Sequence, residues 1–183
     1  MPGQDTAAGA TRGGPIRPAR DLALAAVPRG GRFAAARGVL RQSSRMRDVG
    51  SILAGRIALV VDDDRTMQRL LRRTLEHRGF DVRVAGNVYA AVGNVRREPP
   101  AVVVLDIHLP GGDGFVVLEW LRSVPALRHV PVVVLSAEDP VRIGPSATAA
   151  GATAVLSKSA PLEVIARAIA LVASSAPSSP TLH

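Results

Sequence analysis

The chain of 183 residues contains no cysteine, and only 3% of its residues are aromatic. The absence of cysteine excludes disulfide frameworks, thiolate metal sites and cysteine nucleophiles, and it fits the reducing cytoplasm in which we expect the protein to act. No apolar run approaches the roughly 18 residues that a membrane helix needs, so no membrane partner is expected. Because aromatic side chains are scarce, the core must be built from Val, Leu, Ile and Ala.

The net charge of +8 is concentrated near the N-terminus of the chain. Residues 1–50 hold nine arginines against three aspartates, a net +6, while residues 51–183 hold 14 basic and 12 acidic residues, a net +2. Residues 1–55 are rich in Gly, Pro, Ala and Arg, a composition that favours a disordered leader. This leader makes nucleic acid only a weak candidate partner, because Phe33 is the one aromatic residue interleaved among its arginines.

From Arg56 onward, apolar strand patterns alternate with amphipathic helix patterns, which is typical of a parallel sheet with crossover helices. The pattern predicts an α/β fold with a doubly wound, five-stranded parallel sheet and helices on both faces. We expect this domain at 56–173 and a disordered tail at 174–183. The strands are expected at 57–61, 81–85, 101–105, 131–137 and 152–156.

Local signals predict where the helices begin and whether they continue. Asn87 and Asp113 are placed to cap the second and third helices, because short polar side chains accept hydrogen bonds from the free N–H groups of a first turn. The fourth helix should lie between residues 139 and 150, but Gly144 and Pro145 stand in its middle. Proline removes a hydrogen-bond donor and clashes with the preceding turn, so this helix is expected to be short or broken.

Polar residues follow the strands at one edge of the predicted sheet. Right-handed crossovers place the carboxyl ends of parallel strands along the same edge, where open α/β sheets bind their ligands. Each residue alone would be an ordinary loop residue, but together they form a specific signal, in which Lys158 is the only lysine of the chain. The set comprises Asp62, Asp63 and Asp64 after the first strand, Asp106 after the third, Ser136 after the fourth and Lys158 after the fifth.

Close carboxylates resist joint ionisation, so they either hold protons or surround a cation. With oxygen ligands and no cysteine, the cation that fits is Mg²⁺, which takes one or two carboxylates and completes its shell with phosphate oxygens. An aspartate beside such an ion can attack phosphorus and form an acyl phosphate, while a lysine ammonium and a hydroxyl hold the phosphoryl oxygens. The set therefore predicts a phosphoryl site.

The segments VVDDD, LDIHLPGGDG and VVLSA, and the strand before Lys158, resemble the receiver domain of response regulators in two-component systems. The resemblance covers about residues 56–173, with the motifs in the family's order and spacing. It implies the flavodoxin-like strand order 2-1-3-4-5 and a role for each strand-end residue. Asp106 would be the phosphoacceptor and a metal ligand, Asp63 the direct Mg²⁺ ligand, Asp62 an acid acting mainly through water, the backbone carbonyl of His108 a further ligand, Ser136 the hydroxyl that moves toward the phosphoryl group, and Lys158 the lysine that bonds it.

Two departures from the family pattern fall on its usual signalling face. Receivers usually place Tyr or Phe three residues before the lysine, a ring whose burial reports the switch, and here that residue is Val155. The proline that usually follows the lysine, associated with a cis peptide bond, is replaced by Ser159. A cis bond before a residue other than proline would cost roughly 3 kcal/mol, so a trans bond is expected. The phosphorylation chemistry is thus expected to be intact and the output mechanism unusual.

The resemblance predicts a receiver without an attached effector domain, phosphorylated on Asp106 by a histidine kinase or phosphotransfer protein in a Mg²⁺-dependent reaction. It implies no enzymatic activity beyond phosphorylation and slow dephosphorylation of its own aspartate. Output would pass through an unknown downstream protein or through a homodimer formed on phosphorylation.

Two alternatives remain open from the residues. The first is a receiver fold that acts as a binding module without phosphorylation, which the altered signalling face favours. The second is a haloacid-dehalogenase-type phosphatase with Asp62 as nucleophile, because DDDRT at 62–66 satisfies the D-x-D-x-T loop of that family. That scheme needs an acidic pair after the lysine, where only Glu163 is found, and it leaves Asp106 unexplained.

Overall fold

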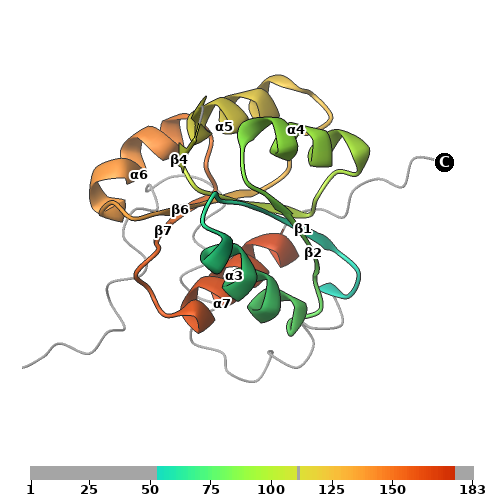
Figure 1. The fold of residues 1–183 in the computed structure, drawn as a ribbon. Coiled ribbons are helices and arrows are strands. Elements are labelled where there is room, and N and C mark those ends of the chain that lie inside the picture. The colour runs from blue at the N-terminus through green and yellow to red at the C-terminus, as the bar shows by residue number, and fades with distance from the viewer. Residues whose placement is uncertain (1–52, 111, 176–183) are drawn as a thin grey trace, which may run out of the picture.

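Strands and helices alternate along the part of the chain that the computed structural model describes, residues 53–110 and 112–175 (Figure 1). None of the helices in this part is long and apolar enough to cross a membrane. In chain order the elements are β1 (Ile57–Val61), α3 (Arg65–Glu76), β2 (Asp81–Ala85), α4 (Val88–Arg97), β3 (Val102–Leu105), β4 (His108–Leu109), β5 (Gly112–Asp113), α5 (Gly114–Ser123), β6 (Val132–Ser136), α6 (Pro140–Ala149), β7 (Ala154–Ser157) and α7 (Leu162–Ser175).

The main sheet has the strand order β2-β1-β3-β6-β7, and each neighbouring pair runs parallel. This confirms the predicted order 2-1-3-4-5, because β6 and β7 are the fourth and fifth strands of this sheet. The strands β1, β3 and β6 are buried along their whole length. Their sequences lack polar alternation because helices cover both faces of the sheet. The short antiparallel pair of β4 and β5 was not predicted, since two residues are too few to show a pattern.

The helices α3 and α7 lie on one face of the sheet, and α4, α5 and α6 lie on the other (Figure 1). Because successive residues of a strand point to opposite faces, Val60 and Val104 pack with the first pair of helices, while Leu59 and Val103 pack with α4 and α5. Full burial of one such side chain contributes about 1.5–3 kcal/mol. Two apolar layers therefore hold the ends of the central strands in fixed positions.

A short polar side chain caps the N-terminus of each of the helices α3, α4, α5 and α6. Asn87 and Asp113 cap α4 and α5 as predicted, each accepting a backbone N–H at 2.9 Å. Asp64 and Asp139 cap α3 and α6 in the same way. Such a cap typically contributes about 1 kcal/mol. The caps also fix the turns that join the strand ends to the helices, and these turns carry the polar residues of interest.

The expectation of a short or broken fourth helix is wrong. The helix α6 runs without interruption from Pro140 to Ala149, with Pro145 inside it. Its buried residues Ile143 and Ala147 belong to an apolar cluster that also contains Val155 of β7. Burial of this helix face offsets the backbone hydrogen bond that proline cannot make, since packing routinely overrides helix propensity.

The C-terminal boundary of the domain also needs correction. The helix α7 continues through Ser175, so Ser174 and Ser175 belong to it and not to the predicted tail. Their hydroxyls both donate to the carbonyl oxygen of Leu171 at 2.9 Å, which satisfies an acceptor of the last turn. The rest of the predicted tail, 176–183, and residues 1–52 of the predicted leader lie outside the described residues.

Candidate functional site

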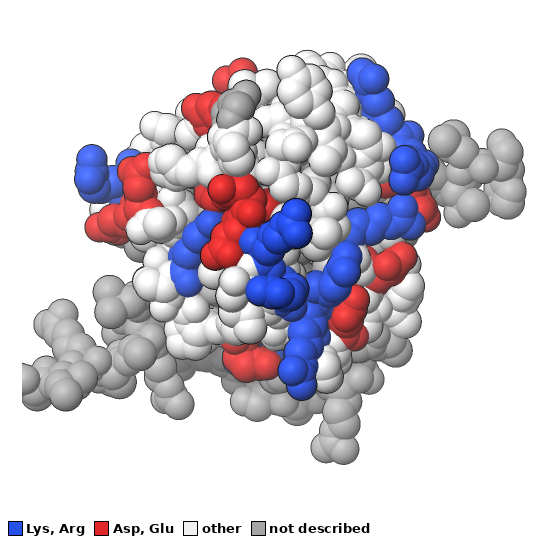
Figure 2. Space-filling view, in the orientation of Figure 1, with Lys and Arg blue, Asp and Glu red and all other residues white. Residues whose placement is uncertain are grey.

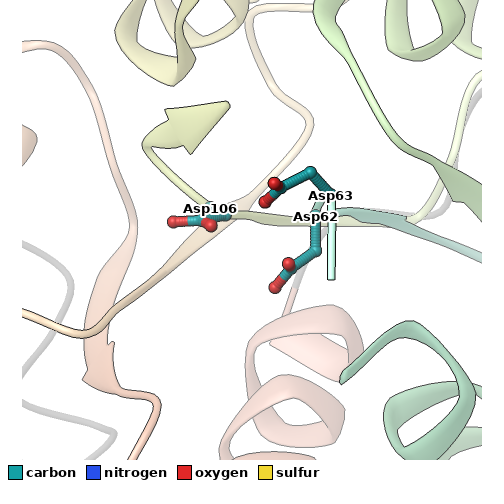
Figure 3. A group of neighbouring side chains, drawn as sticks. All are labelled: Asp62, Asp63 and Asp106. Carbon is teal, nitrogen blue, oxygen red and sulfur yellow. The ribbon is translucent and has the colours of Figure 1, made fainter. Parts of the chain in front are cut away.

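Three aspartates from two neighbouring strands meet at the carboxyl edge of the sheet. Asp62 and Asp63 directly follow β1, and Asp106 directly follows β3. One carboxylate oxygen from each lies within 4.8 Å of the others. Figure 3 shows the side chains of Asp62 and Asp63 leaving the end of β1 and turning toward the same side as Asp106. Asp62 and Asp106 are 2% and 4% exposed, whereas Asp63 is exposed, so the group opens to solvent on one side only.

Lys158 joins the two buried aspartates. Its Nζ lies 2.8 Å from Oδ2 of Asp62 and 2.7 Å from Oδ2 of Asp106. Lys158 follows β7, an edge strand that is separated from β1 by β3 and β6. Its long side chain extends along the carboxyl edge of the sheet toward the two aspartates. A single ammonium therefore faces three carboxylates, which leaves an excess of negative charge.

The electrostatic balance of the site appears in the pKa values of two groups. Burial raises the pKa of Asp62 above its usual 3.8, although hydrogen bonds from Lys158 and the Asp64 amide act in the opposite direction. Burial alone would lower the pKa of Lys158. Hydrogen bonds and charges from Asp106 and Asp62 outweigh the effect of burial, so the pKa of Lys158 is raised above 10.5. The lysine is therefore a permanent cation at neutral pH.

Backbone amides hold the second oxygen of each buried carboxylate. Oδ1 of Asp62 accepts the N–H of Asp64 at 2.9 Å, and Oδ1 of Asp106 accepts the N–H of His108 at 3.1 Å. Each aspartate thus closes a turn over the two residues that follow it. Gln68 of α3 donates from Nε2 to the carbonyl oxygen of Asp62, which ties the loop after β1 to the first helix. The carboxylates are fixed at both oxygens and cannot swing apart.

Ser136, at the end of β6, is fully buried, and its carbonyl oxygen accepts the backbone N–H of Lys158 at 2.8 Å. Its Oγ accepts the backbone N–H of Glu138 at 3.0 Å. The side chain of Glu138 in turn lies 3.1 Å from Nε2 of His108. Since His108 and Glu138 each bond through their backbone to a site residue, their side-chain pair links the loops after β3 and β6 on the solvent side.

Gly114, the first residue of α5, is required by a close backbone approach. Its N–H donates to the carbonyl oxygen of Ile107 at 2.8 Å. A Cβ at this position would collide with the carbonyl oxygen of Asp106 and lie 2.6 Å from Cα of Ile107. The helix can therefore pack against the loop that carries Asp106 only because this residue has no side chain.

The two departures on the expected signalling face are well defined. Val155 is 5% exposed and packs in the apolar cluster beneath α6, so a small branched residue fills the place where a ring was expected. The described residues contain no cis peptide bond, which confirms the expected trans bond between Lys158 and Ser159.

The structure brings Asp62, Asp63, Asp106 and Lys158 together, and backbone hydrogen bonds connect Ser136 and His108 to Lys158 and Asp106. Asp64 turns away from the site to cap α3, accepting the N–H of Thr66 at 2.7 Å. His108 contacts Asp106 through its backbone N–H, and its side chain pairs with Glu138. Sequence reasoning missed Gln68, Gly114 and Glu138. Glu138 could have been found, because it stands two residues after Ser136 just as His108 stands two residues after Asp106.

Charged side chains are unevenly spread around the site. Figure 2 shows acidic side chains next to a group of basic ones on the face that carries α3. This helix exposes Arg65, Arg69, Arg72 and Arg73, and within the described part of the chain only Arg72 has an acidic partner, Glu76 at 3.9 Å. The acidic site is therefore bordered by a basic helix face.

Comparison with known proteins now gives the class of this domain. The model of the response regulator receiver domain family matches residues 58–170, which is most of the described chain. The chain belongs to this family.

Individual relatives agree with the assignment. The response regulator MprA of Mycobacterium leprae is 38% identical over 115 residues, which cover 62% of this chain and 50% of the relative. The response regulator PleD of Caulobacter vibrioides is 38% identical over 81 residues, covering 44% of this chain and 18% of the relative. The chain thus spans half or less of these curated relatives.

Solved structures share the fold. A putative response regulator from Chloroflexus aurantiacus matches with a TM-score of 0.60 and 28% identity, over 65% of this chain and 98% of that one. The chemotaxis protein CheY4 of Vibrio cholerae matches with a TM-score of 0.61 at 24% identity, over 65% and 99% of the two chains, which shows the fold alone.

Proposed function

We propose that this receiver takes a phosphoryl group onto Asp106 from a partner protein and signals through protein contacts. The observation that carries the proposal is the position of Lys158, whose ammonium lies 2.7 Å from Asp106 and 2.8 Å from Asp62, beside the exposed Asp63. An ordinary buried salt bridge would need one acid for one base. Three acids around one lysine leave negative charge that a divalent cation can balance.

The residues present fit Mg²⁺. Their donors are all oxygens, they come from three carboxylates within 4.8 Å, and one of them is open to solvent. We propose that Asp62, Asp63, Asp106 and the backbone carbonyl of His108 hold the ion, with Asp62 acting mainly through water. When bound, Mg²⁺ would supply positive charge for the phosphoryl oxygens.

The residues of the chain have distinct roles in the proposed transfer. A carboxylate oxygen of Asp106 forms the bond to phosphorus while the bond from phosphorus to the donor breaks, and the donor leaves with that electron pair. Lys158, already held beside Asp106, would bond a phosphoryl oxygen. Ser136 would donate its hydroxyl hydrogen to another phosphoryl oxygen, and its oxygen accepts the backbone N–H of Glu138.

The proposed phosphodonor is a histidine kinase or a phosphotransfer protein. The exposed arginines of α3, three of which have no ion-pair partner in the described residues, give a partner an electrostatic contact beside the site. We further propose an unknown downstream protein or a homodimer as the output. The receiver unit of this proposal comprises residues 56–173 and the last two residues of α7, and its only chemistry is on its own aspartate, in the cytoplasm.

The two alternatives fare differently. A module that works without phosphorylation keeps one supporting observation, the buried Val155 in place of an aromatic ring. The haloacid-dehalogenase reading is not favoured, because the receiver family model covers its DDDRT segment. Sustained hydrolysis of small phosphate esters that is lost in Asp62→Asn but kept in Asp106→Asn would revive it.

The test uses acetyl phosphate as a small phosphodonor. The full chain is incubated with acetyl phosphate and MgCl₂, and the intact mass is compared between wild type and Asp106→Asn. We expect one phosphoryl increment in the wild type, none in the variant, and loss of the increment in EDTA. An unmodified wild type under these conditions would favour the module that acts without phosphorylation.

A further inference from the structure

The turn that carries Lys158 is held by two serine hydroxyls. Oγ of Ser157 accepts the backbone N–H of Ser159 at 3.2 Å and forms a second hydrogen bond with Oγ of Ser159 at 2.7 Å. The backbone N–H of Ala160 donates to the carbonyl oxygen of Ser157 at 3.1 Å. Two hydrogen bonds therefore close over Lys158 alone, and the third closes over Lys158 and Ser159.

The backbone of Lys158 is also fixed on the sheet side. Its N–H donates to the carbonyl oxygen of Ser136 at 2.8 Å, which extends the pairing of β6 with β7 by one residue. The φ and ψ angles of Lys158 are thus restrained by the sheet hydrogen bond at its N–H and by the serine pair that flanks it. A serine hydroxyl that accepts the backbone N–H two residues later restrains the turn between them, as the ring of a proline would restrain it.

Restraint of this backbone has a consequence for the ammonium group. A lysine side chain loses up to about 2 kcal/mol of rotamer entropy when it is ordered. The side chain of Lys158 is ordered in this way, because its Nζ lies 2.7 Å from Oδ2 of Asp106 and 2.8 Å from Oδ2 of Asp62, and only 19% of the side chain is exposed. If the backbone of Lys158 could also move, the ammonium would leave the two carboxylates more often. A small rotation at Cα displaces the far end of a long side chain by a larger distance.

We propose that Ser157 is a positioning residue, whose hydroxyl, together with that of Ser159, aims Lys158 at Asp106 and Asp62 in place of the proline that usually follows this lysine. The inference rests on the proposed phosphorylation of Asp106 for its kinetic consequence. Its structural consequence, an ordered lysine side chain, stands apart from phosphorylation and can be measured without it.

The first experiment follows Lys158 itself. Because Lys158 is the only lysine of the chain, a sample labelled with ¹³C-lysine gives a single set of side-chain signals. In the wild type the two Hε protons should be inequivalent, since the ammonium is held. In Ser157→Ala they should merge toward the averaged values of a free lysine, and Ser157→Thr should restore the difference because threonine keeps the hydroxyl.

The second experiment measures the rate of phosphorylation by acetyl phosphate in MgCl₂. Ser157→Ala should slow the reaction by about threefold to tenfold, the effect of losing one hydrogen bond, and Ser157→Thr should recover most of the rate. In a Lys158→Ala background the Ser157→Ala change should have no further effect, because the hydroxyl acts through the lysine. Ser123→Ala is the matched control, since its hydroxyl makes a comparable local bond of 2.8 Å on α5.

The outcomes separate the two proposals. Unchanged lysine signals in Ser157→Ala would overturn the positioning role, and so would equal slowing by Ser157→Ala with and without Lys158. Failure of the wild type to take up phosphate would overturn the phosphorylation of Asp106, while the lysine signals would still decide whether Ser157 holds the turn.

Discussion

Replacing Asp63 by Asn is expected to stabilise the protein without Mg²⁺ and to weaken its stabilisation by Mg²⁺. Carboxylate oxygens of Asp62, Asp63 and Asp106 lie within 4.8 Å of one another. Lys158 contacts the other two acids at 2.8 and 2.7 Å, and within the described residues Asp63 has no ion pair. The substitution therefore removes repulsion without breaking a salt bridge.

The size of the effect follows from the distances. At 4.8 Å, two unit charges in surroundings with an effective dielectric constant of about 20 repel each other by about 3.5 kcal/mol. Asp63 is exposed, so water screens its charge and we expect about 1 kcal/mol to remain. Mg²⁺ at about 100 times its Kd would stabilise the wild type by about 2.7 kcal/mol. A change of about 1 kcal/mol shifts the melting temperature by about 4 °C. In EDTA the variant should therefore melt about 4 °C above the wild type, and in Mg²⁺ the wild type should melt above the variant.

The assay is thermal unfolding followed by circular dichroism, for both proteins in EDTA and in MgCl₂. Glu119→Gln serves as the control, because it removes an exposed acid of α5 that is outside the acidic group. This control should show the wild-type response to Mg²⁺. A variant that melts below wild type in EDTA, or gains as much from Mg²⁺ as wild type does, would refute the reasoning.

Two further predictions concern the buried parts of the site. Because the pKa of Asp62 is raised above 3.8 by burial, the folded protein holds this proton more tightly, and the contribution of Asp62 to stability is lost as pH rises from about 3.8 through the raised pKa. Asp62→Asn should therefore gain stability relative to wild type across that window in urea unfolding without Mg²⁺, and a difference that does not change with pH would contradict this. Gly114→Ala should cost about 1–3 kcal/mol in the same assay and slow phosphorylation, because its Cβ would collide with the backbone of Asp106 and Ile107. A variant with wild-type stability would show that α5 can shift freely.

The fold and most of the site could be predicted because both depend on where apolar strands end. A run such as VVVL in β3 must be buried on both faces, and the parallel arrangement then places Asp62, Asp106, Ser136 and Lys158 on one edge. The types of these residues predicted the chemistry of the site, since a group of carboxylates beside a single lysine is suited to binding a cation and a phosphoryl group. The strand order followed from the same reasoning together with the family resemblance.

The parts that could not be predicted depend on packing between elements. The unbroken α6 needs the buried contacts of Ile143 and Ala147, which the positions of Gly144 and Pro145 do not reveal. The requirement for glycine at 114 arises from a backbone approach between α5 and the loop after β3. Helix propensity and local spacing describe only the segment in which a residue lies. The continuity of α6 and the need for glycine at 114 both depend on contacts with a neighbouring segment.

The geometry of the central strands also explains why the site holds unfavourable charge. The strands β1 and β3 pair in register from Ala58 with Val102 to Val61 with Leu105, so the acids that follow them emerge side by side. Separating the acids would require one strand to slip, which would turn its buried residues toward the opposite helix layer. Relaxation of the fold is therefore too costly to relieve the repulsion between the buried Asp62 and Asp106, and a proton, the Lys158 ammonium or an added cation must do so. A site built this way must respond to whatever binds or modifies Asp106, because its charges cannot adjust by moving apart.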